Sequence, residues 1–120
     1  MQSGNTYTAT ADWTVAGEIQ VIGELSTGAF TTTMAGLTDV DGTLTIPNGG
    51  VYDANGDFNA DGGGSGAVTL TGTGRLRLSA AGSGVSSLGN LSTGAGTVEY
   101  DGGAQEVLAD DYFNLEIDQA

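Results

Sequence analysis

Short alternations of apolar and polar residues run through the whole chain. Leu44 and Ile46 alternate with threonines, and the same pattern recurs at 18–21, 68–71, 75–78, 97–100 and 113–118. Each alternation predicts a short strand with one buried face. Turn signals built from Gly, Asn and Asp separate these strands, at 41–42, 48–50, 55–56, 61–62 and 101–102. Because no stretch shows helical periodicity, we expect one all-β domain over residues 1–120.

Two all-β architectures fit this pattern. Glycine supplies 22 residues and aromatic residues only 7%, so the core must consist mainly of Val, Ile and Leu in thin layers. Short strands with frequent Gly/Asn/Asp turns favour a single-stranded β-solenoid, or β-helix, whose coils stack about 4.8 Å apart. A β-sandwich is the alternative, although it usually has longer strands and more core aromatics. No exact period is present, but residues 23–29 and 89–95 nearly repeat, which indicates two equivalent corners.

The charge balance excludes several classes of function. Fifteen carboxylates face two Arg and no Lys, for a net charge of −13, so binding to nucleic acid or to anionic lipid is not expected. Without His, Cys or Lys, the usual nucleophile–base pairs cannot form, and we expect no enzyme. The nearest carboxylate pairs, Asp110 with Asp111 and Asp39 with Asp41, fit turns and surfaces better than glycoside hydrolysis. No apolar run reaches membrane-spanning length. The acidic surface suits an extracellular location, in a form without a signal peptide.

One run of alternating oxygen-bearing residues could bind a metal. It consists of Asp53, Asn55, Asp57, Asn59 and Asp61. Calcium needs six to eight oxygen ligands, but an EF-hand is excluded because Phe58 stands where that loop requires Gly and no Glu occupies position twelve. The simpler interpretation is a strand with Phe58 and Ala60 buried and its polar face in solvent. No cofactor is required, and calcium remains the alternative.

Other residue types support weaker hypotheses. Alternating threonines at 6, 8 and 10, and threonine pairs at 31–33, 43–45 and 69–71, would form a hydroxyl and methyl array, of the kind associated with ice binding, if they stacked on one flat sheet. Threonine is also an ordinary solvent-facing strand residue, and this explanation is favoured. Tyr7 and Trp13 are the aromatics expected to face outward, where they could stack on sugars. Arg75 and Arg77 share one face and are expected to pair with carboxylates of neighbouring coils.

The two ends of the sequence continue the same pattern. Residues 96–118 predict two strands around a turn, and residues 3–17 extend that order of strands and turns when placed after Ala120. Apolar residues alternate almost to the C-terminus, so both ends of a solenoid would expose core. We therefore predict a head-to-tail contact between subunits or modules, with 1–15 as the joining segment and 16–120 as the main body. The expected interface residues are Tyr7, Trp13, Val15, Tyr112, Phe113, Leu115 and Ile117.

Several segments carry a resemblance to a known group of proteins. Residues 42–60, 72–78, 85–91, 96–102 and 112–117 resemble the tandem Gly-rich β modules of large secreted surface proteins of Bacteroidetes-type bacteria. The resemblance implies extracellular adhesin or fibre modules and carries over no catalytic residue. The expected function is an extracellular structural protein that assembles with itself into a filament, or one module of a tandem fibre. The alternative is an adhesin-type module that binds glycan or a surface through Tyr7, Trp13 or residues 53–61.

Overall fold

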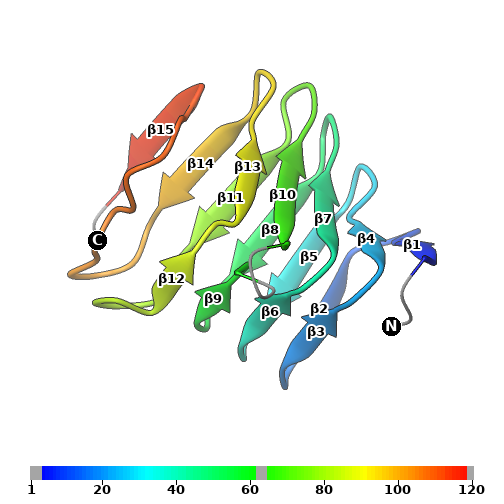
Figure 1. Ribbon diagram of the computed structural model, residues 1–120, viewed down its shortest axis with the longest axis horizontal. Helices are drawn as coiled ribbons and strands as arrows, with labels where there is room; N and C mark the ends of the chain where they lie inside the picture. Colours follow the sequence, from blue (N-terminus) through cyan, green and yellow to red (C-terminus); the bar gives the residue numbers. More distant parts are fainter. Residues whose placement is uncertain (1–3, 62–64, 119–120) are drawn as a thin grey trace.

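The strands form three parallel sheets that wind around one core (Figure 1). The computed structural model describes residues 4–61 and 65–118. Sheet A contains β1 (Thr6–Thr8), β4 (Glu24–Ser26), β7 (Thr43–Ile46), β10 (Ala67–Leu70) and β13 (Asn90–Ser92). Sheet B contains β2 (Trp13–Val15), β5 (Thr31–Met34), β8 (Val51–Ala54), β11 (Arg75–Leu78), β14 (Thr97–Tyr100) and β15 (Asn114–Ile117). Sheet C contains β3 (Ile19–Val21), β6 (Thr38–Val40), β9 (Phe58–Asn59) and β12 (Val85–Ser87).

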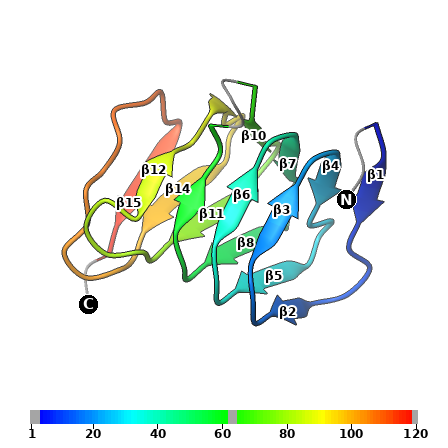
Figure 2. The same ribbon diagram turned by 60° about the horizontal axis from the view of Figure 1, so that its bottom comes forward.

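This arrangement is a β-solenoid, as predicted. From β1 to β14 the chain passes through sheets A, B and C in turn before it starts the next coil, whereas β14 is followed by β15 of the same sheet B (Figure 2). Strands of one sheet pair in parallel with their equivalents in the coils on either side. The alternative prediction of a β-sandwich is wrong, because consecutive strands up to β14 lie in different walls of one tube. Within 4–61 and 65–118 there is no helix, and so none that could cross a membrane.

The predicted alternation places every second strand residue in the core. Leu44 and Ile46 are fully buried and point away from Thr43 and Thr45, which face outward. The same inward or outward orientation recurs at the equivalent position of each coil, so inward-facing residues form rows along the solenoid axis. Sheet B carries two such rows, which are Trp13, Thr32, Tyr52, Leu76, Val98 and Leu115, and Val15, Met34, Ala54, Leu78, Tyr100 and Ile117.

Aromatic residues occupy the centre of the core. Tyr52 and Phe58 are fully buried and meet edge to face, with ring centroids 6.3 Å apart. The Tyr52 hydroxyl forms a hydrogen bond of 2.8 Å with the hydroxyl of Thr38, which is also buried. Burial raises the pKa of Tyr52 because the phenolate would lose its hydration, and the Thr38 hydrogen bond only partly opposes this shift. The tyrosine therefore packs as a neutral side chain whose polar atom has a partner.

The number of residues per coil varies, and the strands stay in register except between β9 and β12, where the pairing shifts between Val85 and Ser87. Thr6 pairs with Glu24, 18 positions later, whereas Phe58 pairs with Val85, 27 positions later. Extra residues are accommodated between the strands. This variation explains why the sequence has no exact period.

Glycines allow the corners to stack closely. The near-repeat at 23–29 and 89–95 places Gly28 and Gly94 at the same corner, after β4 and β13, with φ of 57° and 51°. This confirms the predicted equivalence of the two corners. At another corner, Gly36 lies over Gly17, and a Cβ on Gly36 would overlap the Gly17 carbonyl. A side chain at that position would push two coils apart.

Residues 6–15 form the first coil of the same solenoid. β1 pairs with β4, and β2 pairs with β5. The predicted division between a joining segment 1–15 and a main body 16–120 stays a prediction, although residues 6–15 pair with strands of that main body. A contact between this coil and another subunit or module stays a prediction.

We expect Gly36→Ala to destabilise the fold by about 1–3 kcal/mol, because the new methyl group would collide with the coil beneath it. Gly17→Ala is the matched control, since a Cβ there meets no atom within 4 Å; it should change stability by less than about 0.5 kcal/mol. Urea denaturation of both variants measures the difference. Equal effects would contradict close stacking at this corner.

We expect stability to fall as the pH rises above about 10, the ordinary pKa of tyrosine. The raised pKa of Tyr52 means that the unfolded state releases this proton more readily, so the stabilisation is present below that pH and lost above it. Tyr52→Phe should reduce the alkaline loss and cost about 1 kcal/mol at neutral pH, because Thr38 loses its partner. Urea denaturation between pH 7 and pH 11 would test both expectations.

Candidate functional site

The C-terminal end of the solenoid leaves its core rows uncovered. β15 is the last strand of sheet B, where Leu115 and Ile117 extend the buried rows of Val98 and Tyr100. The two end residues are 44% and 50% exposed, whereas Val98 and Tyr100 are buried. Phe113, which precedes the strand, is 65% exposed. Apolar side chains and an unpaired strand edge therefore occur together at this end.

The loop before β15 is fastened to the core by two tyrosines. The Leu108 amide donates to the Tyr100 hydroxyl over 3.3 Å, and the Tyr112 hydroxyl donates to the Leu108 carbonyl over 2.7 Å. The two hydroxyls lie 3.1 Å apart. Burial, followed by the hydrogen bond with Tyr100, raises the pKa of Tyr112. Tyr112, predicted as an interface residue, thus makes its described polar contacts within its own chain.

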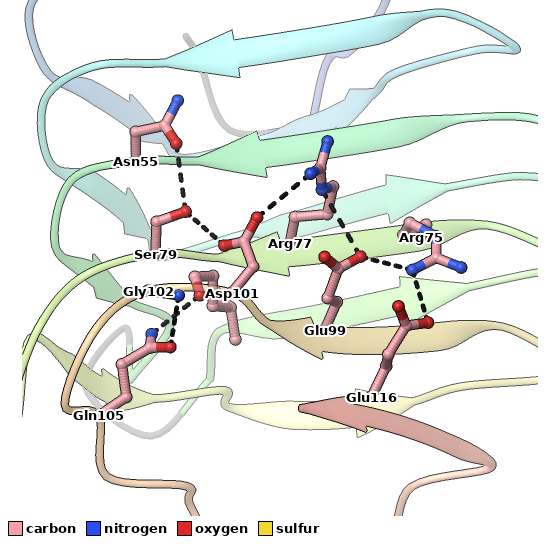
Figure 3. Close-up of polar contacts among 10 residues, drawn as sticks. Asn55, Arg75, Arg77, Ser79, Glu99, Asp101, Gly102, Gln105 and Glu116 are labelled. Carbon is pink, nitrogen blue, oxygen red and sulfur yellow. Dashed lines mark hydrogen bonds and ion pairs between the residues drawn. The ribbon is translucent and has the colours of Figure 1, made fainter. Parts of the chain in front are cut away.

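A ladder of charges on the outer face of sheet B holds the last strands together (Figure 3). Arg75 on β11 contacts Glu99 on β14, and its Nη1 lies 3.1 Å from Oε2 of Glu116 on β15. Arg77 lies 3.6 Å from the same Glu99 carboxylate and 3.2 Å from Asp101. This confirms that both arginines pair with carboxylates of neighbouring coils. The Glu99 side chain is only 6% exposed, whereas that of Glu116 is 49% exposed.

Polar side chains extend this ladder to the adjoining corner (Figure 3). Ser79 donates to Asp101 and lies 3.2 Å from Asn55 Oδ1. Gln105 accepts from the Gly102 amide over 2.7 Å and donates to the carbonyls of Leu78 and Ala80. Sequence reasoning missed Gln105, because a lone glutamine in a glycine-rich turn gives no signal of its backbone partners.

The N-terminal end of the solenoid contains a recess, whereas the C-terminal end presents exposed apolar side chains. A recess of about 330 Å³ opens beside β1 and β2, lined by Tyr7, Trp13, Leu25 and residues 8–12. The Trp13 indole N–H donates to the Thr32 hydroxyl over 2.5 Å. The expectation that Tyr7 and Trp13 face outward is wrong, since both stand in inward rows, opposite Leu25 and Thr32. They are accessible because these rows begin here. Val15 also starts a row and is half-buried.

The predicted calcium ligands are spread around a bend of the chain. Asp53 lies on β8 in sheet B and Asn59 on β9 in sheet C, with Asn55 and Asp57 between the two strands. Asp61 is exposed, and its amide donates to Asn59 Oδ1 over 3.0 Å. Among the described residues, no three acidic side chains are grouped so that they could hold a metal. Phe58 and Ala60 are buried, as the simpler interpretation predicted. Calcium binding stays a prediction.

The threonine pairs form only a narrow array. One outward row of sheet A consists of Thr8, Ser26, Thr45, Thr69 and Ser92. The row beside it is mixed, with Thr6, Glu24, Thr43, Ala67 and Asn90. Thr31 and Thr33 lie on sheet B. The hydroxyl groups therefore make a single column rather than a two-dimensional lattice.

Comparison with protein-family models, with curated proteins and with solved structures finds no match.

We expect Glu99→Gln to lower the free energy of unfolding by about 1–3 kcal/mol, because two guanidinium groups lose a shared, buried carboxylate. Glu116→Gln removes the same charge from an exposed position and should change stability by less than about 0.5 kcal/mol. Thermal and urea unfolding of both variants would measure this contrast. Equal losses would show that burial of Glu99 adds nothing to the ladder.

Proposed function

We propose that this chain is an extracellular structural module that extends end to end with further copies of itself. It would do so as a head-to-tail filament or as one module of a tandem surface fibre. One observation carries the proposal: the inward rows of sheet B run through the whole solenoid and are open at both ends, at Trp13 and Val15 and at Leu115 and Ile117. A further coil at either end would cover them.

The parallel direction of all pairings determines which contact repeats. A copy shifted along the axis, without being turned over, presents its first coil to the last coil of its neighbour. The joint is then parallel, like the pairings inside the chain. Such a contact joins two different surfaces, so it propagates without closing. A copy turned over would instead bring two β15 strands together in antiparallel fashion.

Charge sets the conditions under which separate copies associate. A net charge of −13 makes the copies repel one another at low ionic strength. The screening length falls from about 30 Å in 0.01 M salt to about 8 Å at 0.15 M. Assembly should therefore strengthen with salt, and an extracellular ionic strength would favour it.

The alternative function is an adhesin-type module that binds glycan. The aromatic recess at Tyr7 and Trp13 is the observation that favours it. Glycan binding requires this recess to be open, whereas in the proposed array another copy covers it at every internal joint. Glycan binding by a protein that stays monomeric would support the alternative.

We expect the protein in 0.15 M salt to form filaments visible by negative-stain electron microscopy. Their axial repeat should be about 29 Å, because each copy adds six sheet B strands spaced about 4.8 Å apart. The double variant Leu115→Lys with Ile117→Lys should abolish them by placing charge on the apolar end. Thr45→Lys with Thr69→Lys adds the same charge on the outer face of sheet A and should leave the filaments intact.

Sedimentation over a wide concentration range provides the decisive negative result. A compact monomer at every concentration and salt would overturn the filament. If a direct tandem fusion of two copies also unfolded with the same midpoint and the same steepness as a single copy, the tandem fibre would be overturned as well.

A further inference from the structure

We propose that the joint between copies has one defined register, in which β15 of one copy pairs in parallel with β2 of the next. Leu115 then lies opposite Trp13, and Ile117 lies opposite Val15. This inference rests on the proposed function and specifies its partner as a second copy of this chain.

Sheet B is the wall that can carry the joint. At the C-terminal end, β15 extends it one strand beyond β14, whereas sheets A and C end at β13 and β12. At the other end, the terminal strand of sheet B is β2. Joining these two strands continues both inward rows of sheet B without a break.

Alternation along the strands excludes a shift by one residue. Such a shift would place Asn114 opposite Trp13 and Glu116 opposite Val15 or, in the other direction, Glu116 opposite Trp13 and Asp118 opposite Val15. Apolar side chains would then turn toward solvent, and polar ones toward the core. Besides the proposed register, only registers shifted from it by two residues keep the rows apolar.

Charge and strand length select among the remaining registers. In the proposed register, Glu116 lies opposite Thr14 and Asn114 opposite Asp12, so no two acids face each other. A shift by two residues in one direction places Glu116 opposite Asp12. The opposite shift carries Ile117 past the end of β2, to Gly17 at the corner, and so loses one inward pair. Because like charges directly opposite one another destabilise a strand pair, the first shift is disfavoured by charge, and the second is disfavoured by the lost pair.

The recess provides a second, independent match. In the proposed register, Phe113 comes opposite Ala11, and Ala11 lines the recess beside Tyr7 and Trp13. Phe113 is the most exposed of the large apolar residues described. Its ring would enter an apolar hollow that is flanked by two aromatic residues. The exposed ring and the hollow thus fit each other across the joint.

Disulfide trapping tests this register directly, since the chain contains no cysteine. A Glu116→Cys protein is mixed with a Thr14→Cys protein under mild oxidation. Directly opposed residues of paired strands lie within the 4.4–6.8 Å Cα separation that a disulfide allows. Heterodimers should form on the order of a hundredfold faster than with Thr45→Cys, which lies away from the joint. Asp12→Cys replaces Thr14→Cys to report the shifted register.

The same cysteines placed in a direct tandem fusion, Glu116→Cys in the first copy and Thr14→Cys in the second, remove the dependence on free association. Trapping at 116 and 14 in the mixture or in the fusion supports the inference. Faster trapping with Asp12→Cys, or filaments that show no trapping at 116 and 14, would overturn the register but leave the structural function standing. Failure of both trapping and assembly, in the mixture and in the fusion, would overturn both.

Phe113 can be tested separately from the strand register. Phe113→Ala should weaken association at least about tenfold, because the recess would remain unfilled. Phe30→Ala removes the same side chain from a corner of the second coil that does not line the recess, and should leave association unchanged. Equal affinity of the two variants would contradict the placement of Phe113 in the recess.

Discussion

The hydrogen-bonded ladder between parallel coils is the interaction on which the rest of this structure depends. It holds equivalent strands at a spacing of about 4.8 Å and fixes which residues lie above one another. Rows of like position follow along the axis, both inside the core and on the surface. Side chains must then be compatible with their neighbours in the row as well as with their neighbours in the chain.

This constraint explains two features that look unrelated in the sequence. At the corners, close stacking leaves no room for a Cβ, so glycines such as Gly36 occupy positions where neighbouring carbonyls approach. On the outer face of sheet B, a row of acids would repel itself, and Arg77 separates Asp53 from Glu99. In a chain with only two cations, both lie where carboxylates of successive coils converge.

The ladder gives every coil a hydrogen-bonded neighbour on both sides, except the first coil and the last. At these ends the described solenoid shows a recess between β1 of sheet A and β2 of sheet B on one side, and exposed apolar residues on β15 of sheet B on the other. The proposed function follows from this asymmetry. Because the two ends of the parallel stack are different surfaces, a second copy in the same orientation can cover the exposed end of the first. The interior of the solenoid is inert by comparison. Its buried polar pair, Tyr52 and Thr38, serves packing.

The sequence by itself determined the class of fold and the buried faces of those strands whose alternation is clear, such as Thr43–Ile46 and Arg75–Leu78, because alternation with a period of two is a local property of a strand. It also indicated that Arg75 and Arg77 would meet carboxylates, since they share a face in an acidic chain. Only the tertiary structure revealed the shorter strands, such as Thr38–Val40 and Asn90–Ser92, and decided which strands share a wall, because coil lengths vary from coil to coil. For the same reason the oxygen-rich run from Asp53 to Asp61 proved to turn a corner, and Trp13 proved to begin an inward row. Local pattern shows which side of a strand is buried, but the stacking of coils decides what lies above it.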